Sequence, residues 1–275
     1  MHSQWKEQDI QVEGVQLHYT RTGEGDKPPL IFVHGFSDNG RCWTPVAREL
    51  EHHYDIIMPD MRGHGRSQRV QAEDTVDMVA DVAGLIETLG IRHPIVVGHS
   101  MGAMISFQLA VRYPERVKAL VLEDPPWQLS WPEEFLNGKE HPIATWAKSL
   151  PSTPLSELIS GYRRDHPTWS EEFIHIMAES KKQLDPHIAD IMIQKRFIMG
   201  NDWIKDLPLL KIPVLLFTGN PSLGGIVTAE VTEKVQQLNP QVRIVTINDT
   251  GHLIRFDRFD AFMKELKTFL EELPA

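Results

Sequence analysis

The chain of 275 residues contains almost no cysteine. Cys42 is the sole cysteine, so an internal disulfide is impossible and the buried core must hold the fold together. A chain of this length buries about three quarters of the surface that its unfolded form exposes, which is enough without cross-links. We therefore expect one large domain, or a core with a sizeable insert.

Long apolar runs are missing as well. No stretch of the sequence approaches the roughly 20 apolar residues that a membrane-spanning helix needs. The chain begins MHSQWKE, which is polar and lacks the apolar segment of a signal peptide. These absences predict a cytoplasmic protein that does not insert into a membrane.

Positive charge is in deficit, with 28 Lys and Arg against 38 Asp and Glu and a net charge of −10. Proteins that bind nucleic acid present a basic surface, so this balance argues against a nucleic-acid partner. The histidines and carboxylates do not follow a metal-ligand spacing such as H-E-x-x-H. The sequence therefore predicts neither a metal nor a cofactor.

The sequence does contain an alternation of short apolar runs and helical periodicities. Residues 10–19 alternate in polarity around a Glu-Gly pair and predict a β-hairpin. Apolar runs typical of strands buried on both faces occupy residues 30–33, 56–58, 95–97, 119–122, 214–217 and 242–247. Apolar residues at three- and four-residue spacing predict helices over residues 75–89, 101–112, 228–238 and 258–271. This alternation indicates an α/β fold with a mainly parallel sheet and an antiparallel edge.

The alternation stops after Asp124, and no convincing strand follows until after Pro208. Five of the seven tryptophans lie in this stretch, together with several Phe and Met residues. We interpret residues 125–208 as a helical cap inserted into a core domain made of residues 1–124 and 209–275. The alternative is a set of ordinary α/β helices with aromatic faces. The cap is favoured because about 80 residues without a strand would leave a gap in the alternation.

A candidate nucleophile stands in the sequence Gly-His-Ser-Met-Gly at residues 98–102. This G-x-S-x-G pattern follows a predicted strand and opens a predicted helix, which is the context of a nucleophile elbow. A sharp turn there exposes the Ser100 hydroxyl above the sheet, and the helix N-terminus directs its amides to the same point. The pattern therefore indicates Ser100 as a nucleophile.

Two other turns follow strands that end at the same edge of the sheet. The His34-Gly35-Phe36 turn suits an oxyanion hole formed by the backbone amides of Phe36 and Met101. His252 follows the last strand, where it can serve as the base that a serine nucleophile needs. Ligands of open α/β sheets bind at this edge.

Substrate contacts are predicted beside these turns. We assign them to His34, in the turn after the first parallel strand, and to Trp127, at the start of the aromatic-rich insert. Aromatic and Met side chains commonly line adaptable apolar pockets. The composition of the insert therefore indicates a mainly apolar small molecule as substrate.

In this order the motifs resemble the α/β-hydrolase superfamily from about residue 8 to residue 271. The resemblance is carried by VHGF at residues 33–36, DMRGHGRS at 60–67, the Ser100 elbow, YPERV at 113–117 and GH at 251–252. It implies an eight-stranded sheet, a cap between strands six and seven, and a triad in the chain order serine, acid, histidine.

The sequence departs from the family at the triad acid. The usual acid follows strand seven, where this chain has GNPSLGG at residues 219–225, with Ser222 in place of the aspartate. Some family members, including fungal zearalenone lactonases, carry their acid after strand six. Asp124 is the residue at that position, and it completes a predicted triad with Ser100 and His252. Glu123 and Glu230 are the alternatives for the acid.

The leading hypothesis is a serine hydrolase that cleaves a carboxylic ester or lactone through an acyl-enzyme intermediate. A C–C bond hydrolase of the ring-cleavage type shares the serine elbow but usually keeps the acid after strand seven. A perhydrolase or cofactor-free haloperoxidase and a slowly turning-over small-molecule receptor are further alternatives. Ser100 argues against epoxide hydrolases and haloalkane dehalogenases, because both need a carboxylate nucleophile.

Overall fold

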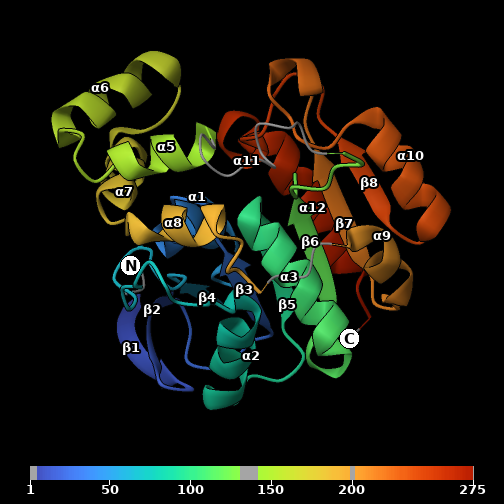
Figure 1. Cartoon of the computed structure of the whole chain (residues 1–275). Coiled ribbons are helices and arrows are strands. Elements are labelled where there is room, and N and C mark those ends of the chain that lie inside the picture. The colour runs from blue at the N-terminus through green and yellow to red at the C-terminus, as the bar shows by residue number, and fades with distance from the viewer. Residues whose placement is uncertain (1–4, 131–141, 199–201, 275) are drawn as a thin grey trace.

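A computed structural model of the chain describes residues 5–130, 142–198 and 202–274. Its sheet has eight strands in the order β1-β2-β4-β3-β5-β6-β7-β8 (Figure 1). The strands are β1 Lys6–Val12, β2 Val15–Arg21, β3 Pro29–Val33, β4 Asp55–Pro59, β5 Ile95–His99, β6 Ala119–Glu123, β7 Val214–Thr218 and β8 Arg243–Thr246. The pairs β1–β2 and β2–β4 are antiparallel, and all the others are parallel. The predicted parallel sheet with an antiparallel edge is confirmed.

Helices cover both faces of the sheet. The helices that follow or precede the parallel strands are α1 Thr44–Leu50, α2 Met78–Thr88, α3 Met101–Arg112, α10 Ala229–Leu238, α11 Ile254–Asp257 and α12 Phe259–Glu272. Short 3-10 turns occupy η1 Gly40–Trp43, η2 Pro114–Arg116, η4 Leu207–Leu209 and η5 Pro221–Leu223. In Figure 1, α2 and α3 lie in front of the sheet, while α1 and α12 lie behind it.

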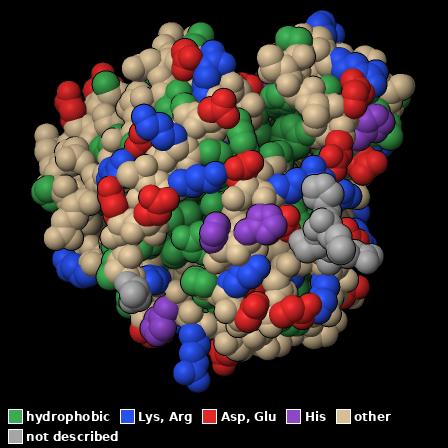
Figure 2. All heavy atoms as spheres, turned by 180° about the vertical axis from the view of Figure 1, so that it is seen from behind, with side chains coloured by type: hydrophobic (Ala, Val, Ile, Leu, Met, Phe, Trp, Pro, Cys, Tyr) green, Lys and Arg blue, Asp and Glu red, His purple; other side chains and the backbone are tan. Residues whose placement is uncertain are grey.

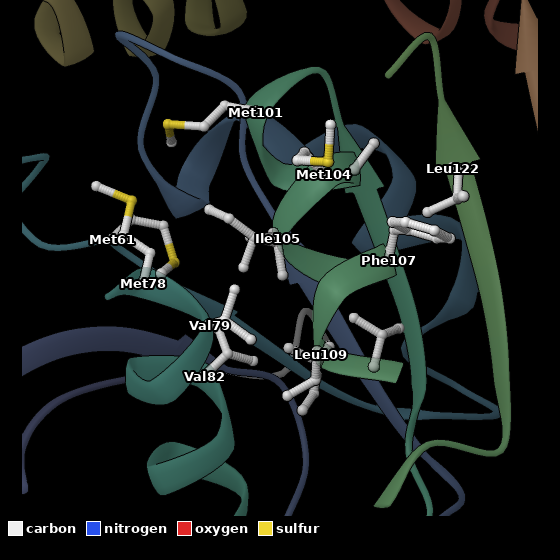
Figure 3. Packing of buried hydrophobic residues seen from close by; sticks show 14 of the residues in the cluster. Met61, Met78, Val79, Val82, Met101, Met104, Ile105, Phe107, Leu109 and Leu122 are labelled. Atoms are coloured by element: carbon white, nitrogen blue, oxygen red, sulfur yellow. The ribbon is translucent and has the colours of Figure 1, made fainter. Parts of the chain in front are cut away.

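The parallel strands β3 to β7 have apolar side chains on both faces, whereas β8, at the end of the sheet, is only partly buried. In β3, Ile31 and Val33 pack with α2 and α3, while Leu30 and Phe32 pack on the opposite face with α1 and α12. In Figure 3, Val79 and Val82 of α2 lie beside Ile105 and Leu109 of α3. Because successive side chains of a strand point to opposite faces, a strand covered on both sides needs apolar residues throughout.

Between β6 and β7, the described residues form the helices α5 Pro142–Ser149, α6 Leu155–Asp165, α7 Glu171–Lys182, α8 His187–Ile193 and α9 Trp203–Asp206. Helices α5 to α8 gather at one corner of the molecule, whereas α9 lies beside α10 (Figure 1). Among the described residues of this segment, the β-type pairing is a single bridge from Phe197 to Val76. Residues 131–141 and 199–201 of the predicted insert lie outside the described part. The division into a core and a cap stays a prediction.

The outer surface is of mixed charge. Figure 2 shows Lys and Arg interspersed with Asp and Glu over the face opposite to that of Figure 1. No helix within the described ranges is both long and apolar enough to cross a membrane.

Phe107 offers a direct test of the packing between α3 and the segment after β6. Its side chain is fully buried, and its ring meets that of Trp127 edge-on, with centroids 5.0 Å apart. Phe107→Ala should lower the free energy of unfolding by about 3–5 kcal/mol, because a large buried ring leaves a cavity. Denaturant titration measures this loss. Leu209→Ala is the control, since Leu209 is 60 % exposed, and it should stay within about 0.5 kcal/mol of wild type.

Candidate active site

Ser100 stands in a strained turn between β5 and α3. Its backbone has φ 53° and ψ −119°, a conformation that costs a residue with a side chain about 1–3 kcal/mol. The Ser100 amide donates to the Glu123 carbonyl at 2.9 Å, which fixes the turn against the end of β6. The side chain is half-buried. A nucleophile elbow has the same strand, strained turn and helix. The role of Ser100 as nucleophile stays a prediction.

The loop after β3 packs directly against this turn. A Cβ on Gly102 would lie 2.2 Å from the Val33 carbonyl oxygen, and a Cβ on Gly35 would lie 2.7 Å from Nδ1 of His99. Only glycine permits both approaches. They hold the loop that carries Phe36 against the start of α3, where the amide of Met101 has no acceptor within the helix. Two backbone donors thus lie on adjoining segments.

His252 forms a hydrogen-bonded pair with Asp124. Nδ1 of His252 donates to Oδ2 of Asp124 at 2.7 Å. Asp124 is fully buried, whereas the His252 side chain is 26 % exposed. The His252 ring packs on the ring of His99, the neighbour of Ser100, with centroids 4.6 Å apart. Because Nδ1 carries the proton, Nε2 keeps a lone pair and can accept one.

The Asp124 carboxylate has two further donors. The amides of Ile226 and Val227 donate to its two oxygens at 2.8 and 3.1 Å. Both amides belong to the segment after β7, where the family usually carries the acid. This segment therefore holds the Asp124 carboxylate through its backbone. Sequence reasoning missed these donors, because backbone amides leave no mark in the residue types.

Comparison with known proteins decides the family. The family model described as the alpha/beta hydrolase fold matches residues 28–165, which is half of the chain. The chain belongs to the α/β-hydrolase family. Hydrolysis is therefore its class of reaction.

Relatives of this α/β hydrolase cover nearly its whole length. N-formylmaleamate deformylase of Pseudomonas putida is 27% identical over 266 residues, with 96% of each chain covered. The 2-(acetamidomethylene)succinate hydrolase of Mesorhizobium japonicum is 26% identical over 269 residues, covering 95% of this chain and 94% of the relative. The solved structure of a thermophilic esterase from Thermogutta terrifontis superposes with a TM-score of 0.76 at 25% identity, covering 98% of this chain and 100% of the esterase.

The two alternative acids of this hydrolase lie in other surroundings. The Glu123 carboxylate is buried and bonded to Arg255. Glu230 is exposed in the first turn of α10, where Thr228 lowers the pKa of its carboxyl through a hydrogen bond. In the loop after β7, the Ser222 hydroxyl donates to Asn220. Of these carboxylates, Asp124 is the one bonded to His252.

The two residues predicted to contact the substrate, His34 and Trp127, are both buried in the interior of the hydrolase. His34 is fully buried; its Nδ1 donates to the Gly35 carbonyl at 2.8 Å, and its Nε2 accepts from the Met61 amide at 2.9 Å. Trp127 is also fully buried, stacked on Trp203 with ring centroids 5.1 Å apart. The interpretation of these two side chains as substrate contacts is not supported by this placement. His34 braces the loop that carries Phe36.

The described part of the hydrolase contains no group of three or more His, Cys, Asp or Glu residues close enough to hold a metal ion. The chemical groups of the candidate site are the Ser100 hydroxyl, the His252 imidazole and the Asp124 carboxylate. These three groups come from the turn after β5, the loop after β8 and the end of β6.

Three buried histidines around the site give the hydrolase an expected pH dependence. Burial lowers the pKa of His34 and His99, and it lowers the pKa of His64 to about 3. In the unfolded chain these rings take up a proton below about pH 6.5. The unfolded state then binds more protons than the folded state, so stability should fall as the pH drops below that value.

Denaturant unfolding at pH 7.5, 6.5 and 5.5 measures this loss. Each histidine contributes at most about 1.4 kcal/mol per pH unit. His64→Asn keeps a donor for the Arg62 carbonyl that Nδ1 of His64 contacts. The free energy of unfolding of this variant should depend less steeply on pH, by the contribution of one histidine. His53→Gln, at an exposed histidine, should leave the slope unchanged. A stability that does not fall below pH 6.5 would contradict the neutral, buried state of these rings.

Proposed function

We propose that this chain is a serine hydrolase that cleaves a carboxylic ester or lactone of a mainly apolar small molecule. The observation that carries the proposal is the His252–Asp124 pair at 2.7 Å, packed against the residue that precedes the strained Ser100 turn. A serine hydroxyl attacks a carbonyl at neutral pH only with a neighbouring base. In this proposal His252 is that base.

The first half-reaction forms the acyl-enzyme. Oγ of Ser100 attacks the carbonyl carbon while Nε2 of His252 takes the hydroxyl proton. The carbonyl oxygen becomes an oxyanion, which the amides of Phe36 and Met101 stabilise, and each such donor typically contributes about 3 kcal/mol. The C–O bond then breaks, and the imidazolium returns its proton to the leaving alkoxide.

The second half-reaction releases the acid. His252 takes a proton from a water molecule, which attacks the acyl carbonyl. The C–O bond to Ser100 then breaks, and the imidazolium returns that proton to Oγ of Ser100. Asp124 holds the Nδ1 tautomer of His252 and stabilises the positive charge that the ring carries in both half-reactions. Its bonds to Ile226 and Val227 keep the carboxylate aimed at the ring.

Amide hydrolysis is a second candidate function. The names of two relatives, N-formylmaleamate deformylase and 2-(acetamidomethylene)succinate hydrolase, denote the hydrolysis of N-acyl compounds. The same triad can cleave an amide if His252 delivers its proton to the leaving nitrogen. The two candidates differ in the leaving group and share Ser100.

The test is a substrate panel combined with a covalent probe. Nitrophenyl esters of short and medium acyl chains, a lactone, and the nitroanilide of the best acyl group are compared with the wild-type enzyme. The proposal predicts turnover of the ester or lactone, and modification of the Ser100 peptide by an organophosphate. Faster cleavage of the nitroanilide would favour the amide candidate. Absence of turnover together with an unmodified Ser100 would overturn both.

A further inference from the structure

A fully buried ion pair lies directly behind the candidate triad. Glu123 ends β6 and immediately precedes Asp124, while Arg255 lies in α11, three residues after His252. The side chains are 0% and 1% exposed. Oε1 of Glu123 accepts from the Arg255 amide at 2.8 Å, and Oε2 accepts from Nη1 at 2.5 Å. One carboxylate therefore holds both the backbone and the side chain of Arg255.

The guanidinium also contacts two aromatic rings and the Cys42 thiol, while its Nε is buried without a hydrogen-bond partner among the described residues. It lies between the rings of Trp43 and Phe256, with Cζ 3.7 and 3.9 Å from the two ring centroids. Nη2 donates to Sγ of Cys42 at 3.3 Å. Aromatic faces attract the charge and confine the plane of the group, so it cannot swing to another acceptor.

Glu123 is connected to each part of the triad. Its carbonyl accepts the Ser100 amide at 2.9 Å, its carboxylate holds the segment that follows His252, and Asp124 is its covalent neighbour. Burial raises the pKa of the Glu123 carboxyl, and the charge of Arg255 opposes that effect. A buried ion pair is often no more stabilising than apolar residues of the same volume. Its connections to three triad segments offer a reason for it beyond stability.

We propose that Glu123 and Arg255 are positioning residues that set His252 in register with Ser100 for proton transfer. This inference rests on the proposed function, because positioning His252 matters only if Ser100, His252 and Asp124 form a catalytic triad. Neither side chain is exposed to a substrate, so both act through His252. A misplacement of about 1 Å in such a group can cost about 100-fold in rate.

The test uses Glu123→Gln and Arg255→Lys with the best nitrophenyl ester. Glutamine at position 123 has one acceptor oxygen for the two N–H donors of Arg255. Lysine at position 255 keeps the positive charge but lacks the planar guanidinium. Each change should lower kcat about 10- to 100-fold while KM stays within about twofold. In a His252→Ala background, Glu123→Gln should cause no further loss of rate, because the group that it positions is gone.

Asp55→Asn is the matched control. Asp55 accepts two hydrogen bonds from Nε and one from Nη2 of Arg21, and its side chain is 2% exposed. Asp55 is the first residue of β4 and lies at the amino ends of the parallel strands, whereas Ser100 follows the carboxyl end of β5. Its loss should lower the melting temperature as much as Glu123→Gln does, but leave kcat unchanged.

The outcomes separate this inference from the proposed function. If Glu123→Gln lowers the melting temperature and leaves kcat at the wild-type value, the positioning role is wrong while the triad stands. An equal loss of rate in the His252→Ala background also overturns it. If Ser100→Ala retains turnover, the proposed function itself fails. If Glu123→Gln does not fold, Arg255→Lys carries the same comparison.

Discussion

Ser100→Ala should hydrolyse a nitrophenyl ester at least about 10⁴-fold more slowly than the wild-type enzyme. Alanine removes the atom that forms the acyl-enzyme, and what remains is the contribution of the oxyanion donors and of binding. Steady-state turnover and a burst experiment measure the loss, since a burst of nitrophenol reports acyl-enzyme formation. Circular dichroism checks the fold of the variant.

Ser222→Ala is the control for Ser100. Ser222 is an exposed serine in the loop after β7, bonded to Asn220. Its variant should retain wild-type turnover and still show the burst. If the Ser100→Ala enzyme still showed the burst, another residue would be the nucleophile.

Asp124→Asn should lower kcat by about 10³- to 10⁴-fold. The carboxylate accepts from the ring of His252 and from the amides of Ile226 and Val227. An asparagine has one acceptor oxygen, and its NH₂ group must face at least one of these N–H donors. Either His252 takes the wrong tautomer or a buried amide loses its partner, at about 1–3 kcal/mol.

The measurement for Asp124→Asn is kcat and its pH profile at a temperature well below the melting transition. Glu230→Gln is the control, because Glu230 is an exposed carboxylate in α10 and should be replaceable without effect. A wild-type kcat in Asp124→Asn would exclude it as the acid of the triad.

The fold could be predicted from the sequence because its strands are covered on both faces. The parallel strands β3 to β7 then contain continuous apolar runs, as in Leu30–Val33 or Ile95–Val97, and the hairpin before them shows the alternation of an edge. The last strand, β8, lies at the other end of the sheet and is only partly buried. The candidate positions Ser100 and His252 came from the same pattern, because Ser100 directly follows β5 and His252 lies in the loop after β8.

Side-chain direction could not be predicted from the same pattern. His34 stands next to the oxyanion loop, yet its ring turns inward because the Met61 amide and the Gly35 carbonyl occupy its two nitrogens. Trp127 follows β6 closely, but its ring stacks on Trp203, which is distant in sequence. Long-range packing determines both orientations, and local residue type does not encode it.

A backbone angle determines which of Glu123 and Asp124 contacts His252. Asp124 has φ 43°, so the chain leaves the strand geometry at this residue. The strand alternation therefore no longer tells which of the two neighbouring carboxylates meets His252. The backbone amides of Ile226 and Val227 that select Asp124 come from a segment 102 and 103 residues away.

Cys42 gives this molecule an intrinsic reporter of its own opening. The thiol is buried against Arg255, and burial raises its pKa, so the reactive thiolate is absent from the closed state. A reagent can then alkylate this single thiol only after the core around Cys42 and Arg255 opens and exposes it. The rate of that reaction under native conditions therefore measures how often this part of the core opens, without any label or added mutation.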